Sequence, residues 1–217
     1  MSRSTSFDTE SQPIERRIAV GLNKIGLALK LQSWRTAGER GLTPLQGQVL
    51  ATLLPDRSGV RPSTLASRLA VTAATISESV AALSSKGLVE RRPDPDDGRV
   101  NLVSLSSKGR TVARQAAGWP DFLSTAVESL SEEEQEVFWK GLLKLIRSLQ
   151  QAGQVPISEM CLTCVHFRPS VHKDPGLPHH CALVNAPMGH RHLRLECDEH
   201  EVASPEVQAE VWAAFTS

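Results

Sequence analysis

The stretch "VTAATISESVAALSSKGLVERRPDPDDGRVNLVSLSSKG", residues 71–109, decides the fold. Its first part carries Ile76, Val80 and Leu83 at the spacing that places apolar side chains on one face of an α-helix. Thr72 stands just before that pattern and is a typical N-cap, because its hydroxyl can accept a hydrogen bond from a backbone N–H of the first turn. The sequence therefore predicts a helix that begins after Thr72 and stops at the glycine of SSKG.

A β-hairpin is predicted directly after this helix. The extended runs LVERR and RVNLVSL are joined by the turn-forming segment PDPDDG. Asp97 and Gly98 lie between the two runs, and such a pair indicates a hairpin because glycine tolerates the positive φ that these turns require.

Further helices are predicted on both sides of this stretch, separated by proline and glycine. The last of them should open with a capping box, because Glu134 follows Ser131 at the third position. The predicted helices span residues 13–38, 43–54 (capped by Thr43), 62–69, 106–130 (capped by Ser106 and bent near Gly118–Pro120) and 131–150.

Two short helices joined by a tight turn and followed by a charged hairpin make a winged helix-turn-helix. The apolar face of the second helix should leave small and polar side chains outward at Ala73, Ala74, Thr75, Ser77, Glu78 and Ser79. Small side chains let a helix lie close to base edges in the major groove of DNA, and the surrounding excess of basic residues suits contacts to phosphates. The candidate DNA-binding residues are Arg61, Ser63, Thr72, Ala74, Thr75, Ser77, Glu78, Ser79, Lys86, Arg91, Arg92, Asp97 and Arg99.

This winged helix-turn-helix resembles the MarR family of transcription factors. The family's wing pattern of Asp, Arg, a strand and then Leu-Ser/Thr-x-x-Gly is matched by Asp97, Arg99, residues 100–103 and residues 105–109. The resemblance covers about residues 13–150. It implies a homodimer, formed through the first and last helices, that acts as a repressor on a pseudo-palindromic operator. It also implies that the recognition helices read the bases and that each wing tip enters the adjacent minor groove.

The resemblance assigns roles to single residues: Thr75, Ser77, Glu78 and Ser79 fall on the recognition helix, Arg99 on the wing tip, and Asp97 on the carboxylate that braces Arg99. Glu78 departs from the family, in which a basic residue often stands at this position. An acid there could repel phosphate, or it could accept a hydrogen bond from a cytosine amino group. A second alternative stays open, because some winged helices bind protein instead of DNA.

The predicted architecture is mainly α, with one β-hairpin wing, long dimerisation helices and a small metal-stapled C-terminal module. The apolar stripe of the helix at 131–150 could pack within the monomer. Together with the stripe of the first helix, however, it exceeds what a small DNA-binding module needs, which favours a dimer. The predicted domains are a disordered N-terminus (1–12), the winged-helix and dimerisation domain (13–150), a linker (151–156) and a cysteine- and histidine-rich module with a short C-terminal helix (157–217).

All 4 cysteines and all 7 histidines lie between Cys161 and His200. This segment has few large apolar residues, so an apolar core alone should not hold it folded and it should need a cross-link such as a bound metal. The pair Cys161-x2-Cys164 can face one ion from a tight turn, which indicates a metal. The expected metal is zinc, structural or sensory, and the alternatives are an iron–sulfur cluster that senses redox state or iron, and no metal at all. The leading ligands are Cys161, Cys164, Cys181 and Cys197, with His200 as a substitute.

A zinc-dependent enzyme is the rival function, because acidic residues and spare histidines stand beside these cysteines. The sequence holds no HExxH, no Gly-rich phosphate loop and no nucleophile elbow, so the chain is not expected to be an enzyme. A cytoplasmic protein is expected, since there is no apolar run of about 20 residues and no apolar signal core. By resemblance to the family, a small aromatic effector is expected beside the dimer helices, where Trp34 could line the pocket.

Overall fold

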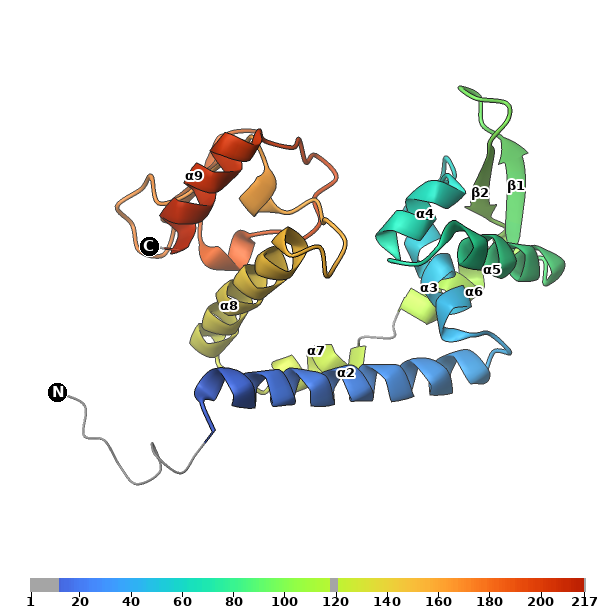
Figure 1. Cartoon of the computed structure of the whole chain (residues 1–217), viewed down its shortest axis with the longest axis horizontal. Helices are drawn as coiled ribbons and strands as arrows, with labels where there is room; N and C mark the ends of the chain where they lie inside the picture. The colour runs from blue at the N-terminus through green and yellow to red at the C-terminus, as the bar shows by residue number, and fades with distance from the viewer. Residues whose placement is uncertain (1–11, 118–120, 217) are drawn as a thin grey trace. The chain divides into compact units, whose positions relative to one another are not determined.

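The computed structural model describes residues 12–117 and 121–216 (Figure 1). The chain divides into two compact units. Unit 1 consists of Met1–Ala66 and Val71–Phe122, and unit 2 of Ser67–Ala70 and Leu123–Ser217. Across the described ranges, no helix is both long and apolar enough to cross a membrane.

The N-terminal half of the chain is helical, as the sequence predicts. Its helices are α2 (Ile14–Gly38), α3 (Pro44–Leu53), α4 (Pro62–Arg68), α5 (Ala73–Ser85) and α6 (Ser107–Ala117). Three predicted N-caps are confirmed, because side-chain oxygens of Thr43, Thr72 and Ser106 accept backbone N–H bonds of 3.2, 3.2 and 2.9 Å. Helices α3, α5 and α6 therefore begin where a hydroxyl satisfies a free N–H of the first turn, whereas α2 begins after Pro13 without a side-chain cap.

The predicted hairpin is present and extends beyond α5 (Figure 1). Strands β1 (Val89–Pro93) and β2 (Asn101–Leu105) pair antiparallel. Val60 adds a third strand position, because its N–H and C=O each bond to Val103 at 2.9 Å. Gly98 was expected to adopt a positive φ in the turn, and this prediction is wrong, because Gly98 is not among the described residues with positive φ. The turn is closed instead by the Val100 N–H, which donates to the Asp97 carbonyl at 2.9 Å.

The core of unit 1 lies between the helix-turn-helix and the wing. Ile76, Val80 and Leu83 are buried on one face of α5, as their spacing predicts. They share the interior with buried side chains from the neighbouring helices and the wing, namely Val49, Leu50, Leu53, Leu65, Val103 and Ala113. This common apolar interior holds α5 and the wing in one unit.

Unit 2 joins the last long helix to the cysteine-rich segment. The helix at the unit boundary is α7 (Asp121–Val127), and α8 (Glu132–Gln151) begins with the predicted capping box of Ser131 and Glu134. A three-stranded antiparallel sheet follows, with order β3 (Phe167–Arg168), β4 (His179–Cys181) and β5 (Ala186–Met188). The other elements are the short helices η1 (Cys161–Thr163) and η2 (His190–His192) and the C-terminal helix α9 (Pro205–Thr216).

The cysteine-rich segment has a core of its own, which the sequence did not predict. Leu143 of α8 packs in one buried cluster with residues from η1, β3, the loop after η2 and α9. The other buried members are Met160, Leu162, Cys164, Phe167, Leu193, Val211 and Phe215. The compact units therefore divide near residue 122, and α8 belongs with the segment that was expected to lie beyond a linker at 151–156.

Two other predictions concern the helix at residues 106–130 and the N-terminal segment 1–12. The single helix expected over 106–130 is two helices, α6 and α7, and the bend expected at Gly118–Pro120 lies outside the described residues. Most of the N-terminal segment expected to be disordered, residues 1–11, also lies outside them.

Gly109 provides a test of the wing's attachment to α6. A Cβ at this buried glycine would lie 1.7 Å from the backbone oxygen of Leu88, so we expect Gly109→Ala to destabilise unit 1 by about 1–3 kcal/mol or more. Gly98→Ala is the matched control, since a Cβ there meets no atom within 4 Å. Thermal unfolding followed by circular dichroism measures both, and an unchanged midpoint for Gly109→Ala would refute the close approach.

Candidate nucleic-acid interface

The N-terminal half of α5 presents small and polar side chains to solvent. The exposed residues of this face are Ala73, Ala74, Ser77 and Glu78, and Thr75 is half-buried. The hydroxyl of Thr72 lies 2.8 Å from that of Thr75, so the side chains at the cap are held against each other. With no bulky side chain on this face, the helix can approach the base edges of a major groove closely.

Ser79 departs from the expected outward position. Its side chain is buried, with 8% of the residue exposed. The reason is helical geometry, because Ser79 follows the buried Ile76 by three residues and stands directly before Val80 on the same side of α5. The prediction that Ser79 faces outward is therefore wrong, and we remove it from the set of candidate DNA contacts.

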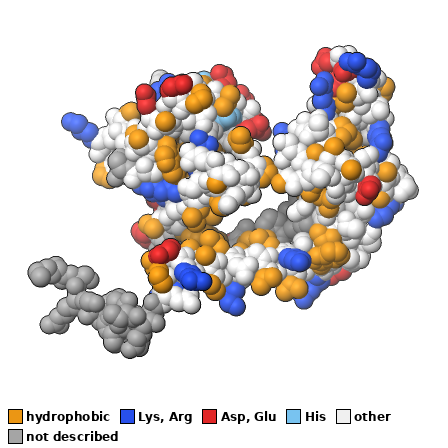
Figure 2. Space-filling model, viewed as in Figure 1, with side chains coloured by type: hydrophobic (Ala, Val, Ile, Leu, Met, Phe, Trp, Pro, Cys, Tyr) orange, Lys and Arg blue, Asp and Glu red, His pale blue; other side chains and the backbone are white. Residues whose placement is uncertain are grey.

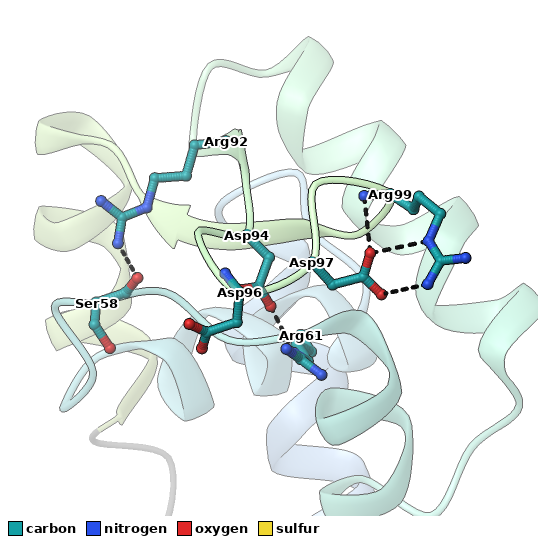
Figure 3. Close-up of polar contacts among 7 residues, drawn as sticks. All are labelled: Ser58, Arg61, Arg92, Asp94, Asp96, Asp97 and Arg99. Atoms are coloured by element: carbon teal, nitrogen blue, oxygen red, sulfur yellow. Dashed lines mark hydrogen bonds and ion pairs between the residues drawn. The ribbon is translucent and has the colours of Figure 1, made fainter.

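The tip of the wing carries an arginine held by a carboxylate (Figure 3). The Nε of Arg99 donates to Asp97 Oδ1 at 3.1 Å, and the Arg99 backbone N–H donates to the same oxygen at 3.1 Å. These two hydrogen bonds, the side-chain one first, hold the pKa of Asp97 below its ordinary value. Arg99 Nη2 also donates to Asp97 Oδ2 at 3.4 Å, so the expected brace is present. The side chain of Arg99 is nevertheless 91% exposed, so the guanidinium can still meet another group.

A second carboxylate holds the hairpin where β1 meets the turn, and the sequence did not single it out. Asp94 is buried and accepts a hydrogen bond of 2.6 Å from Arg61 Nε, as Figure 3 shows. It also accepts from the Asp96 N–H at 2.9 Å. The backbone bond first, and then Arg61, lower the pKa of Asp94 against the opposing effect of desolvation. All three aspartates of PDPDDG look like turn residues in sequence, and nothing local marks the first as buried.

Two of the other predicted basic residues, Arg92 and Lys86, donate hydrogen bonds within the fold. Arg92 donates to the backbone oxygen of Ser58 (Figure 3), and Lys86 Nζ donates to Gly41 O at 2.6 Å and to Gln46 Oε1 at 2.9 Å. Lys86 therefore joins the end of α5 to the start of α3, which is a structural role. Arg91 and Ser63 are exposed.

Basic and acidic side chains gather at the tip of the hairpin in Figure 2. The acidic ones are already engaged in part, since Asp94 and Asp97 accept the hydrogen bonds from Arg61 and Arg99 described above. Unit 1 thus combines a helix face without bulky side chains and a projecting arginine, an arrangement that suits a duplex with a groove and a phosphate backbone.

The predicted metal ligands come together in unit 2. Cys161, Cys164, Cys181 and Cys197 are all free thiols, and all of them line one cavity of about 30 Å³. Burial raises the pKa of the Cys161 thiol, and the other three cysteines add to that rise. Within residues 12–117 and 121–216, no three His, Cys, Asp or Glu side chains are already grouped as ligands of one ion.

The histidines have partners within the fold. His200, the proposed substitute ligand, lines the same cavity, but its Nε2 lies 3.0 Å from Thr163 Oγ1. Buried His179 accepts a hydrogen bond of 3.0 Å from the Ser170 N–H, and burial beside His190 lowers its pKa to about 4. His192 Nδ1 accepts from the Gly189 N–H at 2.8 Å. Each of these three histidines therefore has a hydrogen-bond partner within the fold.

Sequence relatives of this chain are transcriptional regulators. The MarR family model matches residues 40–100. The chain is 31% identical to the transcriptional regulator HosA of Escherichia coli O111:H- over 100 residues, which are 46% of this chain and 71% of HosA. It is 31% identical to the HTH-type transcriptional repressor YetL of Bacillus subtilis over 112 residues, 51% of this chain and 67% of YetL. A Mycobacterium tuberculosis regulator, MT0903.1, is 30% identical, but the match spans only 61% of its length.

Solved structures of two proteins in complex with DNA have the same fold. FabT of Streptococcus pneumoniae in complex with DNA matches with a TM-score of 0.57 and 27% identity, over 64% of this chain and 99% of FabT. The MepR–DNA complex of Staphylococcus aureus matches with a TM-score of 0.54 and 26% identity, over 60% of this chain and 97% of MepR. With its helix-turn-helix, its wing and these relatives, the chain belongs to the MarR family of winged helix-turn-helix DNA-binding transcriptional regulators.

Proposed function

We propose that this chain is a homodimeric repressor that binds a pseudo-palindromic operator. One observation carries the proposal: unit 1 contains both the exposed face of α5, with its small and polar side chains, and the exposed Arg99 of the wing. In this arrangement α5 enters the major groove and the wing tip reaches the neighbouring minor groove. An arginine in a narrow minor groove is attracted by the negative potential there.

Exposed apolar side chains on two long helices support a dimer. Along α2 only Ala37 is buried, and Figure 2 shows hydrophobic side chains along this helix. A helix that exposes so many apolar residues needs a partner, and a second copy of the chain is the simplest one. The exposed apolar residues are Ile14, Ile18, Val20, Leu22, Ile25, Leu27, Leu29, Leu31 and Trp34 on α2, and Val137, Phe138, Leu145 and Leu149 on α8.

Repression follows from occupancy, because a dimer on an operator that overlaps a promoter excludes polymerase; YetL, one of the relatives, is a repressor. Two inputs could change that occupancy. One is a small aromatic effector near Trp34, whose ring is largely exposed on α2. The other is a cysteine-ligated metal centre in unit 2, either structural or sensory.

Selection of duplexes from a random pool by the full-length protein tests the proposal. We expect the selected sites to be pseudo-palindromes with half-sites about one helical turn apart, each site bound by two protomers, because a two-fold protein requires a two-fold site. Sites without symmetry, or no enrichment over the starting pool, would overturn the proposal.

Arg99→Ala tests the wing contact. We expect affinity for the selected operator to fall about fivefold or more, on the order of 1 kcal/mol, because a guanidinium is removed from the minor groove. Lys173→Ala is the control, since it removes one positive charge from an exposed loop of unit 2, outside the helix-turn-helix, the wing and α2. Titrations at one salt concentration compare the variants, and equal affinities for Arg99→Ala and Lys173→Ala would rule out a wing contact.

Glu78→Ala decides how the exposed acid on α5 acts. If Glu78 accepts a hydrogen bond from cytosine, its removal should relax the preference at one base pair, which is worth about 1–3 kcal/mol. If Glu78 only repels phosphates, the same change should tighten binding to all sequences alike. Affinities for a set of single-base operator variants distinguish these results, and Ser77→Ala, on the neighbouring exposed position, is the control.

A further inference from the structure

Four thiols from separated segments of unit 2 meet at one cavity. Cys161 begins η1, Cys164 follows it, Cys181 ends β4, and Cys197 lies in the loop between η2 and α9. Each is free, although all line the same space of about 30 Å³. Loops that bring four reduced thiols together without a disulfide are typical of thiolate metal sites.

The surroundings of the cavity also suit bound thiolates. The apolar side chains of Phe167, Leu183 and Met188 line it. The Arg194 N–H donates to Cys161 Sγ at 3.2 Å, and Arg194 Nη1 lies 3.9 Å from Cys197 Sγ. N–H groups directed at sulfur stabilise negative charge on it, and such contacts orient the ligands of metal sites.

We propose that Cys161, Cys164, Cys181 and Cys197 bind one metal centre through four thiolates. His200 is left out of the ligand set because Thr163 Oγ1 engages its Nε2 at 3.0 Å. His166 is left out because its Nε2 lies 3.4 Å from Glu201 Oε1. Metal binding would draw the sulfurs of the cavity to about 2.3 Å from the ion.

The possible occupants are alike in that thiolate sulfur binds the metal in each of them. A single Zn²⁺ fits the cavity as it stands, because a cavity of about 30 Å³ holds one water-sized body. An iron–sulfur cluster takes the same four cysteines but requires the walls to move apart. With Zn²⁺ the four thiolates leave a net charge of about minus two, which the Arg194 guanidinium offsets in part.

The centre would add a restraint on unit 2 beside its apolar core, which already holds β3 through Phe167. The core already fastens α8, η1 and α9 through Leu143, Leu162 and Phe215. Between them, residues 169–176 and 182–185 are mostly exposed loops. A metal on Cys181 and Cys197 would therefore restrain the sheet and the loop before α9.

Elemental analysis and a visible spectrum of the full-length protein, purified without oxygen, test the site. We expect either about one Zn²⁺ per chain or iron with acid-labile sulfide and absorption in the visible range. Cys181→Ser should lose the metal, and His172→Ala, at an exposed histidine outside the cavity, should keep it. His200→Ala should also keep it, because only sulfur ligands are proposed.

A second measurement covers the case in which Cys181→Ser does not fold. Reduced, metal-free wild-type protein is titrated with Co²⁺, whose absorption bands report tetrahedral coordination and thiolate ligation. Trypsin then tests the restraint, since exposed Lys173 and Arg194 lie in loops near the ligands. We expect cleavage at these residues to accelerate at least several-fold on metal removal and to slow again on reloading. Neither readout involves DNA, so the site can fail without the proposed function failing.

Three results would overturn the proposal: protein without metal that also takes up no Co²⁺, full metal content in the Cys181→Ser variant, or loss of metal in the His200→Ala variant alone. Operator affinity measured on metal-loaded and metal-free protein then assigns the role. Equal affinities make the centre a structural staple, and unequal affinities make it a sensor, because an effector acts only through differential binding to two states.

Discussion

One buried carboxylate fixes the wing relative to the helix-turn-helix. A two-stranded hairpin is marginally stable alone, so its direction depends on what holds it to the rest of the unit. Asp94, the residue after β1, accepts a hydrogen bond of 2.6 Å from Arg61, which precedes α4, and Val60 and Val103 form a bridge nearby. Because removal of Arg61 would leave the buried Asp94 carboxylate without its charged partner, this contact is costly to break. The position of Arg99 relative to α5, on which the proposed DNA contact depends, follows from it.

The helix α8 links the two proposed roles of unit 2. Leu143 on one side of α8 is buried with residues of the cysteine-rich segment, and Phe138, Leu145 and Leu149 remain exposed for a partner. The cysteine-rich segment is thus packed against a proposed dimerisation helix and is not an appendage beyond a linker. A change in the packing of this segment could reach the dimer through one rigid element, which gives a metal on the four cysteines a physical route to the operator.

Local signals in the sequence were enough for the elements of the fold. Thr43, Thr72 and Ser131 cap the helices they were expected to cap, because capping depends on only a few neighbouring residues. Long-range contacts were not visible: nothing near Asp94 shows that it is buried, and nothing near Leu143 shows that it packs on residues of the cysteine-rich segment. The prediction that Ser79 is exposed was wrong for a local reason, because Ser79 lies at the edge of the buried face of α5. The cysteines were found by spacing, but their common cavity depends on the fold of unit 2.

Hydrogen–deuterium exchange on the protein with and without its selected operator tests the central claim most directly. If α5 and the wing form one DNA-reading surface held by Asp94, bound DNA should slow exchange at residues 73–78 and 97–100 together, and Asp94→Asn should reduce the protection at 97–100 more than at 73–78. Protection confined to unit 2, or protection of α5 with none at the wing tip in the wild-type protein, would contradict the account.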